Sequence, residues 1–286
     1  MKLSLILKAG LVLGLSQSLL ANDLDTLDTE FDSTRAKALE TNNPSMVKSL
    51  RDKYRSIAAT ATGKDKIRAA ARMGRLYIFE GDILTPRSTP AARKAVFDEC
   101  IEAMDVIKPG NGVGENQPYY YLKISCLSFM AEVGSLKDKL AAKAYYGGSK
   151  DLFFKGVKQG TEYQGGGIYR SAAGVMSNPL ARLVGLYKPE QAVAYANTAL
   201  ESDPHWLDTE ELTGDLFCEN YRYKLEALKV QGKTAEAMST LQDALETFGI
   251  VFNGSGVEKI EFSPETLIPE TKVCAQRLFN LRKKLR

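Results

Sequence analysis

The chain has 286 residues, of which 26% are charged and 44% are hydrophobic, with 38 Lys and Arg against 35 Asp and Glu. This is the composition of a globular protein, and a net charge of +3 supplies no field that would hold nucleic acid or an anionic membrane. Its single histidine, His205, excludes metal sites built from several histidines and is the only imidazole for a catalytic triad. We therefore expect no catalytic residue, no metal, no cofactor and no enzymatic activity, and we expect His205 to cap or pack beside Trp206.

The N-terminus has the pattern of a secretory signal. A charged start precedes an apolar run that ends at the small residue Ala21. The uncharged stretch from Ala9 to Ala21 is shorter than the ~20 residues of a membrane-spanning helix. We predict a signal peptide over residues 1–21, with cleavage after Ser18 as the alternative, and no transmembrane segment after cleavage. Because no cysteine lies near the cleavage site, we expect a periplasmic or secreted protein that is not a lipoprotein.

The rest of the chain reads as helices. Residues 22–44 are acidic and polar with little apolar periodicity, which predicts a loose polar lead-in segment. From Ser45 onward, apolar residues recur at the three- and four-residue steps of amphipathic helices, and Gly- and Pro-rich turns separate these stretches. We predict one all-α domain over residues 45–286. Its helices are expected from Ser45 and then over about 64–81, 90–107, 118–146, 149–159, 168–176, 188–202, 210–231, 233–248 and 264–284.

One stretch has a β pattern. Ile250-Val251-Phe252 and the run from Val257 to Phe262 flank Asn253-Gly254-Ser255-Gly256. A short turn of this kind between apolar runs predicts a small β-hairpin near 250–262. Asn253-Gly254-Ser255 also has the form of a glycosylation site, but we interpret it as the turn itself.

Two helices carry a repeat-like pattern. Small residues recur at Ala192, Ala196 and Ala199, and the same steps of four and three return at 237, 241 and 244. Such positions let paired helices approach closely in the second helix of tetratricopeptide repeats. The two matches are farther apart than the usual period of about 34 residues, so we predict an irregular array of tetratricopeptide-like helical hairpins. The alternative is a helical bundle that uses small residues for ordinary packing.

The four cysteines are even in number, which favours disulfides in an oxidising compartment. Cys100 and Cys126 stand at similar distances from the turn between their two predicted helices, so antiparallel packing brings them to matching heights. Cys218 and Cys274 lie at similar depths in two later helices, which would match if these helices pack in parallel. We predict the pairs Cys100–Cys126 and Cys218–Cys274, with buried free thiols as the alternative.

The most unusual segment is 163–180, where Gly165, Gly166 and Gly167 open a helix that carries Arg170. Backbone N–H groups at such a start can face an anion, and Arg170 can add a forked donor to a carboxylate. No strand precedes the glycines and no GxxxxGK[ST] pattern is present, so this is no nucleotide motif. The alternative is a tight turn in which Arg170 bonds to backbone carbonyls or to a neighbouring acid.

Aromatic residues gather in the middle of the chain. Rings with polar tips can line a cleft for an apolar or amphipathic ligand, although such rings also form cores. The predicted ligand-binding residues are Tyr119, Tyr120, Tyr145, Tyr146, Phe153, Phe154, Tyr169 and Arg170.

The leader, the irregular repeat-like helices and the Gly-Gly-Gly-Ile-Tyr-Arg-Ser-Ala-Ala-Gly stretch followed by Asn178-Pro179 resemble the T-component family of TRAP transporters, the TatT-like periplasmic proteins. The resemblance is firmest over 163–245. It implies a helical-repeat protein that associates with a periplasmic solute-binding subunit, with room for homo-oligomers and for a hydrophobic ligand in a cavity or pore. The matching positions, which we regard as fold-defining first, are Gly166, Gly167, Tyr169, Arg170, Gly174 and Pro179. Family members are often lipoproteins, and this chain has no cysteine at its cleavage site.

These features predict an exported, non-enzymatic accessory protein that binds a protein partner and a small apolar ligand. A purely structural protein scaffold of the cell envelope, without a ligand, is the alternative. A third hypothesis, an envelope hydrolase with paired carboxylates, has no spacing motif behind it.

Overall fold

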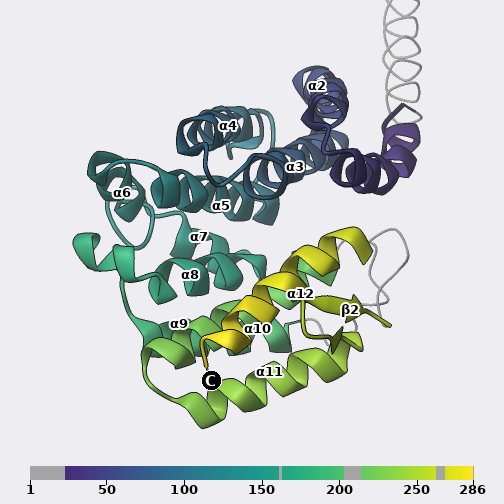
Figure 1. Ribbon diagram of the computed structural model, residues 1–286. Helices are drawn as coiled ribbons and strands as arrows, with labels where there is room; N and C mark the ends of the chain where they lie inside the picture. The colour runs from purple at the N-terminus through teal and green to yellow at the C-terminus, as the bar shows by residue number, and fades with distance from the viewer. Residues whose placement is uncertain (1–22, 161–162, 203–213, 262–267, 286) are drawn as a thin grey trace, which may run out of the picture.

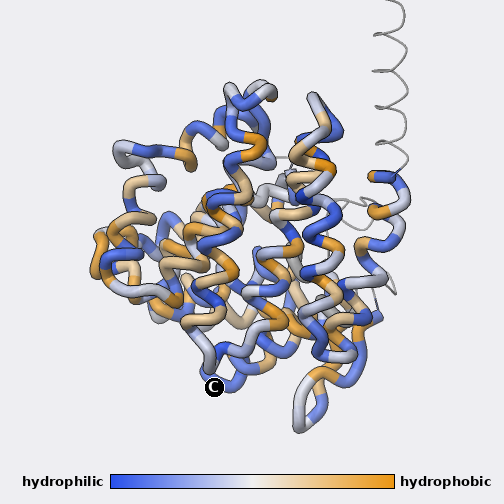
Figure 2. Tube along the Cα trace, turned by 90° about the horizontal axis from the view of Figure 1, so that it is seen from above, coloured by the Kyte–Doolittle hydropathy of each residue, from blue (hydrophilic) through white to orange (hydrophobic). Residues whose placement is uncertain are grey.

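The computed structural model describes residues 23–160, 163–202, 214–261 and 268–285. The predicted signal peptide, His205 and Trp206 lie outside these residues. Within them the chain is all-α with one small β-hairpin, as predicted. Hydrophobic and hydrophilic residues are interspersed along the helices, as expected for amphipathic helices with apolar residues at three- and four-residue steps (Figure 2).

The helices follow one another as stacked hairpins, from α2 and α4 at one end of the molecule to α11 at the other (Figure 1). α2 packs on α3, α4 on α5, α8 on α9, α9 on α10, and α10 on both α11 and α12. The α-helices are α2 (Pro44–Thr60), α3 (Gly63–Phe79), α4 (Pro90–Ala103), α5 (Gln117–Val133), α6 (Leu136–Lys143), α7 (Phe153–Val157), α8 (Gly167–Ser177), α9 (Pro189–Glu201), α10 (Gly214–Val230), α11 (Thr234–Phe248) and α12 (Ile268–Lys283). Short π or 3-10 turns extend three of them: η1 (Glu80–Leu84), η2 (Met104–Ile107) and η3 (Pro179–Val184).

The lead-in segment differs from its prediction, because residues 23–41 form a helix. Its few apolar residues fall on one stripe, and Leu24 and Phe31 are fully buried. On the acidic side, Asp28 accepts a hydrogen bond from the Tyr54 hydroxyl at 2.7 Å and pairs with Arg72 at 3.2 Å. The prediction of a loose segment is wrong here because three or four buried side chains and a few ion pairs are enough to hold an otherwise polar helix.

The predicted helix over 118–146 is broken in two. α5 ends at Val133, Gly134 terminates it, and Ser135 begins α6 with a capping box in which its hydroxyl and the Asp138 carboxylate each satisfy a backbone N–H. Ser-x-x-Asp after a glycine is a recognisable start signal, although the apolar period runs on across it. The predicted helix over 149–159 is correspondingly reduced to the five residues of α7.

The β-hairpin is confirmed in a shorter form. β1 (Val251–Phe252) pairs antiparallel with β2 (Val257–Lys259). The Asn253 side chain accepts hydrogen bonds from the backbone N–H groups of Ser255 and Gly256 at 2.9 and 3.0 Å, so this residue makes the turn that its sequence predicts.

Both predicted disulfides are present. Cys100–Cys126 joins α4 to α5, and Cys218–Cys274 joins α10 to α12. Two disulfides are typical of proteins from an oxidising compartment. In the described part of the chain no helix is long and apolar enough to cross a membrane.

The repeat-like stripes lie at helix interfaces. Ala192, Ala196 and Ala199 on α9 are fully buried, and α9 packs against both α8 and α10. On α11 the buried residues Ala237 and Ala244 belong to the helix that packs on α10. The small residues therefore have the close-packing role that the repeat pattern predicts.

Among the described residues this stacking produces two large hydrophobic cores and a small cluster of Met176, Ala192 and Ala227. One runs from Leu24 to Leu186 and fills the N-terminal hairpins, and the other runs from Cys218 to Leu278 and fills the C-terminal ones. The region where the two cores meet holds the candidate site.

Candidate functional site

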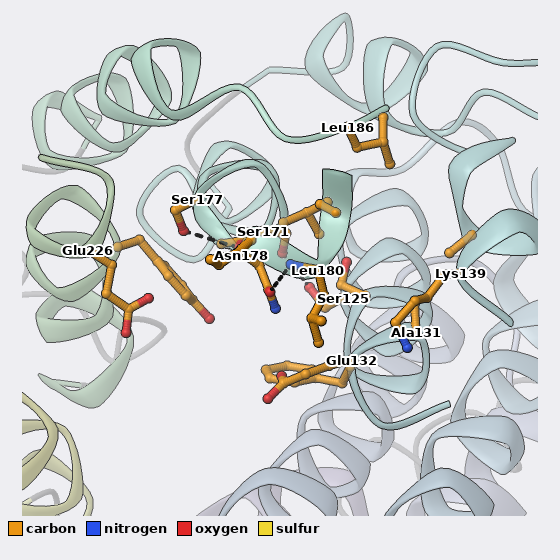
Figure 3. A pocket seen from close by; sticks show the side chains of 18 of the residues that line it. Ser125, Ala131, Glu132, Lys139, Ser171, Ser177, Asn178, Leu180, Leu186 and Glu226 are labelled. Atoms are coloured by element: carbon orange, nitrogen blue, oxygen red, sulfur yellow. Dashed lines mark hydrogen bonds between the residues drawn. The ribbon is translucent and has the colours of Figure 1, made fainter. Parts of the chain in front are cut away.

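A cavity of about 360 Å³ lies where the two cores meet (Figure 3). Its walls come mainly from α5, α8 and α10, while α6 and η3 supply further lining residues such as Lys139 and Leu180. The volume is in the range of small-molecule sites, which bury most of a ligand in roughly 300–1,000 Å³.

The three wall helices each present one stripe of residues to this cavity. On each helix the lining residues follow steps of three and four, which places them on one face. The side chains are mixed, with hydroxyls and carboxylates among apolar groups, and the Ser125 and Ser171 hydroxyls hydrogen-bond at 2.7 Å to join α5 to α8. The stripes are Ser125, Ser128 and Glu132 on α5, Ser171 and Gly174 on α8 with Asn178 directly after it, and Tyr223, Glu226 and Val230 on α10.

Gly174 sets the approach of α8 to α10. A Cβ added at Gly174 would lie 2.8 Å from two carbon atoms of the Tyr223 ring, closer than real Cβ contacts come. Tyr223 in turn lines the cavity, and burial raises the pKa of its hydroxyl above the ordinary value. Gly174 is one of the positions that match the T-component family, and in this chain a glycine is needed there because α8 packs directly against the Tyr223 ring.

We expect Gly174→Ala to push the Tyr223 ring away from α8 and to lower the free energy of unfolding by about 1–3 kcal/mol through overpacking. Chemical denaturation measures this loss. Gly114→Ala is the matched control, because a Cβ there meets nothing within 4 Å and its φ is ordinary. An equal stability of both variants would show that α8 and α10 can move apart freely.

An ion-pair network links the two cores beside the cavity. Asp82 pairs with Arg277 of α12 at 2.9 Å and with Arg93 of α4 at 3.1 Å, and Arg277 also pairs with Glu219 of α10 at 2.8 Å. Burial on its own would raise the pKa of Asp82, but the charge and hydrogen bond of Arg277 outweigh it and hold this pKa below the ordinary value. Asp82 and Arg277 are far apart in the chain, so the network holds N- and C-terminal helices together.

A second, smaller cavity of about 70 Å³ adjoins the first. Four arginines line it: Arg35, Arg75, Arg170 and Arg277. The two cavities share the lining residues Asp82, Ser125, Phe129, Ser171 and Tyr223.

An exposed apolar patch surrounds the α6 and η3 side of the larger cavity. We define it as Leu136 and Leu140 on α6 with Leu180 and Leu183 on η3, all about half exposed or more. α6 packs against η3, and Leu180 also lines the cavity. Large apolar side chains gathered in this way on a surface are typical of interaction sites.

The predicted ligand-binding residues are distributed differently. Tyr146 lines the larger cavity and Arg170 the smaller one. The other six line neither cavity: Phe153 is buried against the rings of Tyr146 and Tyr169, and Tyr119 packs edge-on against Tyr120. The remaining two are Tyr145, which is partly buried, and Phe154, which is half exposed.

Arg170 makes the contacts predicted by the alternative, a tight turn in which its side chain bonds to backbone carbonyls. Its Nη1 donates to the carbonyls of Gln164 and Gly165 at 2.8 and 3.2 Å, and its Nη2 donates to the Tyr121 hydroxyl at 2.9 Å. These bonds hold the turn before α8 closed. Both Nη atoms of Arg170, which the sequence suggested as a forked donor to a carboxylate, are therefore used in these bonds.

The glycines before α8 serve the fold. Gly166 has a φ of 66°, and a Cβ there would lie 2.6 Å from the Cα of Ala199, so only glycine fits between α8 and α9. Gly167 lies directly against the Tyr121 ring. Pro179 opens η3 behind the Asn178 cap and lines the larger cavity.

Sequence reasoning missed most of the cavity wall. Ser125, Ser128 and Ser171 are small polar residues on mostly apolar helix faces, and Asp82 lies in a short π-helical turn between two helices. A signal was available along α5, where Ser128 and Glu132 follow Ser125 by three and seven positions. This spacing identifies a polar face of the helix, but it does not show which helix faces pack against one another.

The described residues include no group of three or more His, Cys, Asp or Glu side chains placed to hold a metal ion. Comparisons with protein-family models, with curated proteins and with solved structures give no match for this chain.

Proposed function

We propose that this chain is an exported helical-repeat accessory protein that binds a small molecule with an apolar body in the larger cavity and a protein partner at the apolar patch. This role resembles that of the T-component of TRAP-type transport. The observation that carries the proposal is the cavity of about 360 Å³ between the two cores, which has the volume and the partly apolar lining of small-molecule sites.

The lining supports a ligand with both apolar and polar parts. Phe129, Val175 and Val184 offer apolar contact, while Ser128 and Ser177 offer hydroxyls. The patch of Leu136, Leu140, Leu180 and Leu183 adjoins the cavity through Leu180, so a partner bound there would lie beside the ligand. Such a placement suits transfer of a ligand to or from a solute-binding subunit.

The alternative is a purely structural scaffold that binds protein partners and no ligand. The apolar patch serves both hypotheses equally well. The cavity favours the accessory role, because a scaffold does not need a pocket with the volume of a small-molecule site.

We expect Val175→Phe to abolish binding of the neutral apolar probe N-phenyl-1-naphthylamine, because the larger ring fills the cavity that Val175 lines. Probe fluorescence titrated against the mature protein measures the affinity. Val251→Phe is the matched control: Val251 is 44% exposed on β1 and lines neither cavity, so it should leave the affinity unchanged.

Native mass spectrometry of the mature protein from an oxidising periplasm is the complementary experiment. Denaturing the same sample identifies any small molecule that is released. Failure of the wild type both to bind the probe and to release a molecule would contradict the ligand-binding role and favour the scaffold.

A further inference from the structure

Arg75 on α3 has no hydrogen-bond partner for its Nη1 and Nη2 atoms among the described residues. Only 7% of this residue is exposed, and it lines the smaller cavity. Buried polar groups in folded proteins are nearly always paired, so a guanidinium with an unused fork is an exception that requires a reason.

The charges around Arg75 are mostly of the same sign. Arg35 and Arg72 both act on it, and together with burial, which is the largest cause, they lower its pKa to about 10. Asp32 and Tyr163 act in the opposite direction but more weakly. The nearby acids are engaged elsewhere: Asp32 pairs with Arg35 at 3.1 Å, and Asp28 pairs with Arg72 at 3.2 Å.

The other arginines of the smaller cavity have partners. Arg277 holds Asp82 and Glu219, and Arg170 holds two carbonyls and the Tyr121 hydroxyl. Arg75 makes a cation–π contact with the Phe31 ring, and its guanidinium carbon lies 5.0 Å from the ring centroid. The guanidinium carbons of Arg35 and Arg72 lie 5.0 and 4.8 Å from the centroid of the same ring, so three cations share one aromatic ring.

A shared ring does not offset the cost of this burial. A buried cation is expensive unless it is paired and hydrogen-bonded, and a cation–π contact replaces only part of that loss. Water molecules would fit into about 70 Å³, but they carry no charge and would leave the cluster of arginines unbalanced.

We propose that Arg75 receives the carboxylate of a ligand whose apolar body occupies the larger cavity. The two cavities share the lining residues Ser125, Ser171 and Tyr223, so they lie directly beside each other and the head group of the ligand would lie next to its apolar body. The two free Nη groups match the two oxygens of a carboxylate in a forked pair. This inference rests on the proposed function and adds the chemical class of the ligand, an amphipathic monocarboxylate.

The test compares probes that differ only in the head group. Decanoate, decanol and decyl phosphate each displace N-phenyl-1-naphthylamine from the mature protein, and the displacement curves yield their affinities. We expect decanoate to bind about ten-fold or more tightly than decanol, as a charge-assisted pair of hydrogen bonds implies. Decyl phosphate is expected to bind more weakly than decanoate, since its third oxygen finds no further arginine fork.

Arg75→Met is expected to remove the preference for decanoate over decanol while decanol and the naphthylamine bind as before. Arg72→Met is the matched control, because Arg72 lies on the same helix and over the same ring but already pairs with Asp28 and lines neither cavity. It should retain the preference. A preference that is absent from the wild type, or that persists in Arg75→Met, overturns the inference, and tighter binding of decyl phosphate overturns the assignment to a carboxylate.

Thermal unfolding without ligand provides a second readout. Removing an unpaired buried charge should leave the Tm of Arg75→Met equal to or above that of the wild type, whereas Arg72→Met should lower it by losing the pair with Asp28. A large fall of Tm in Arg75→Met would show that Arg75 stabilises the chain by itself. If none of the probes binds the wild type, the proposed function fails, whereas binding of decanol and the naphthylamine without a preference for decanoate removes only the present inference.

Discussion

Asp82→Asn should lower the free energy of unfolding by about 3–5 kcal/mol, the loss expected when one partner is removed from a buried ion pair. The side chain of Asp82 is only 10% exposed and pairs with Arg277 and Arg93, and the substitution leaves these cations without their shared carboxylate. The network also joins helices from the two cores. Urea denaturation at neutral pH measures the loss.

Asp98→Asn is the control for this prediction. Asp98 pairs with Lys94 at 2.7 Å, but the two side chains are 47% and 33% exposed, so the loss there should stay within about 0.5 kcal/mol. Equal midpoints for the two variants would mean that the Asp82 network contributes no more than a surface pair.

The Asp82 effect should depend on pH. Because the pKa of Asp82 is lower in the folded than in the unfolded chain, its stabilisation is complete above the unfolded pKa, near 3.9, and is lost as the pH falls through the folded pKa. The difference in stability between wild type and Asp82→Asn should therefore shrink below about pH 4. A difference that is constant from pH 7 to pH 3 would contradict this linkage.

Removing the Cys218–Cys274 disulfide should cost about 4 kcal/mol, the second large effect that we expect. The two residues are 56 positions apart, so the bond removes considerable freedom from the unfolded chain. Replacing both cysteines by alanine and measuring denaturation of the unreduced protein tests this value.

The other disulfide provides the comparison. Cys100 and Cys126 are 26 positions apart, so the same replacement there should cost less, about 3.5 kcal/mol. All four residues are buried to the same degree, so the loss of packing is similar and the difference reports the loop length. The reverse order would show that strain or residual structure outweighs loop entropy.

Much of the fold could be predicted from local patterns. The apolar period located the helices, and the count and spacing of the cysteines gave both pairs. The failures were local as well. The helix over 23–41 was not predicted, because its apolar residues are sparse and a few ion pairs help to stabilise it. The helix end at Gly134 was not predicted, because the apolar period continues over 118–146 and the capping box at Ser135 outweighs it.

The candidate site was far less predictable. The conspicuous residues were aromatic, and most of them pack against one another, as Phe153 does with Tyr169. The cavity walls are built instead from inconspicuous residues such as Ser125 and Gly174, and the unpaired cation Arg75 is one of 38 Lys and Arg residues in the chain.

The sequence by itself determined most of the helices and the turn at Asn253, because these depend on neighbours along the chain. The even number of cysteines indicated disulfides, and the predicted pairs rested on assumed packing of the helices that the tertiary structure confirmed. Only the tertiary structure decided that the faces of α5, α8 and α10 meet around a cavity, that Asp82 reaches Arg277, and that Arg75 is left without a partner. The physical reason is that burial and pairing depend on which helices become neighbours in space, and many helix arrangements satisfy the same apolar period equally well.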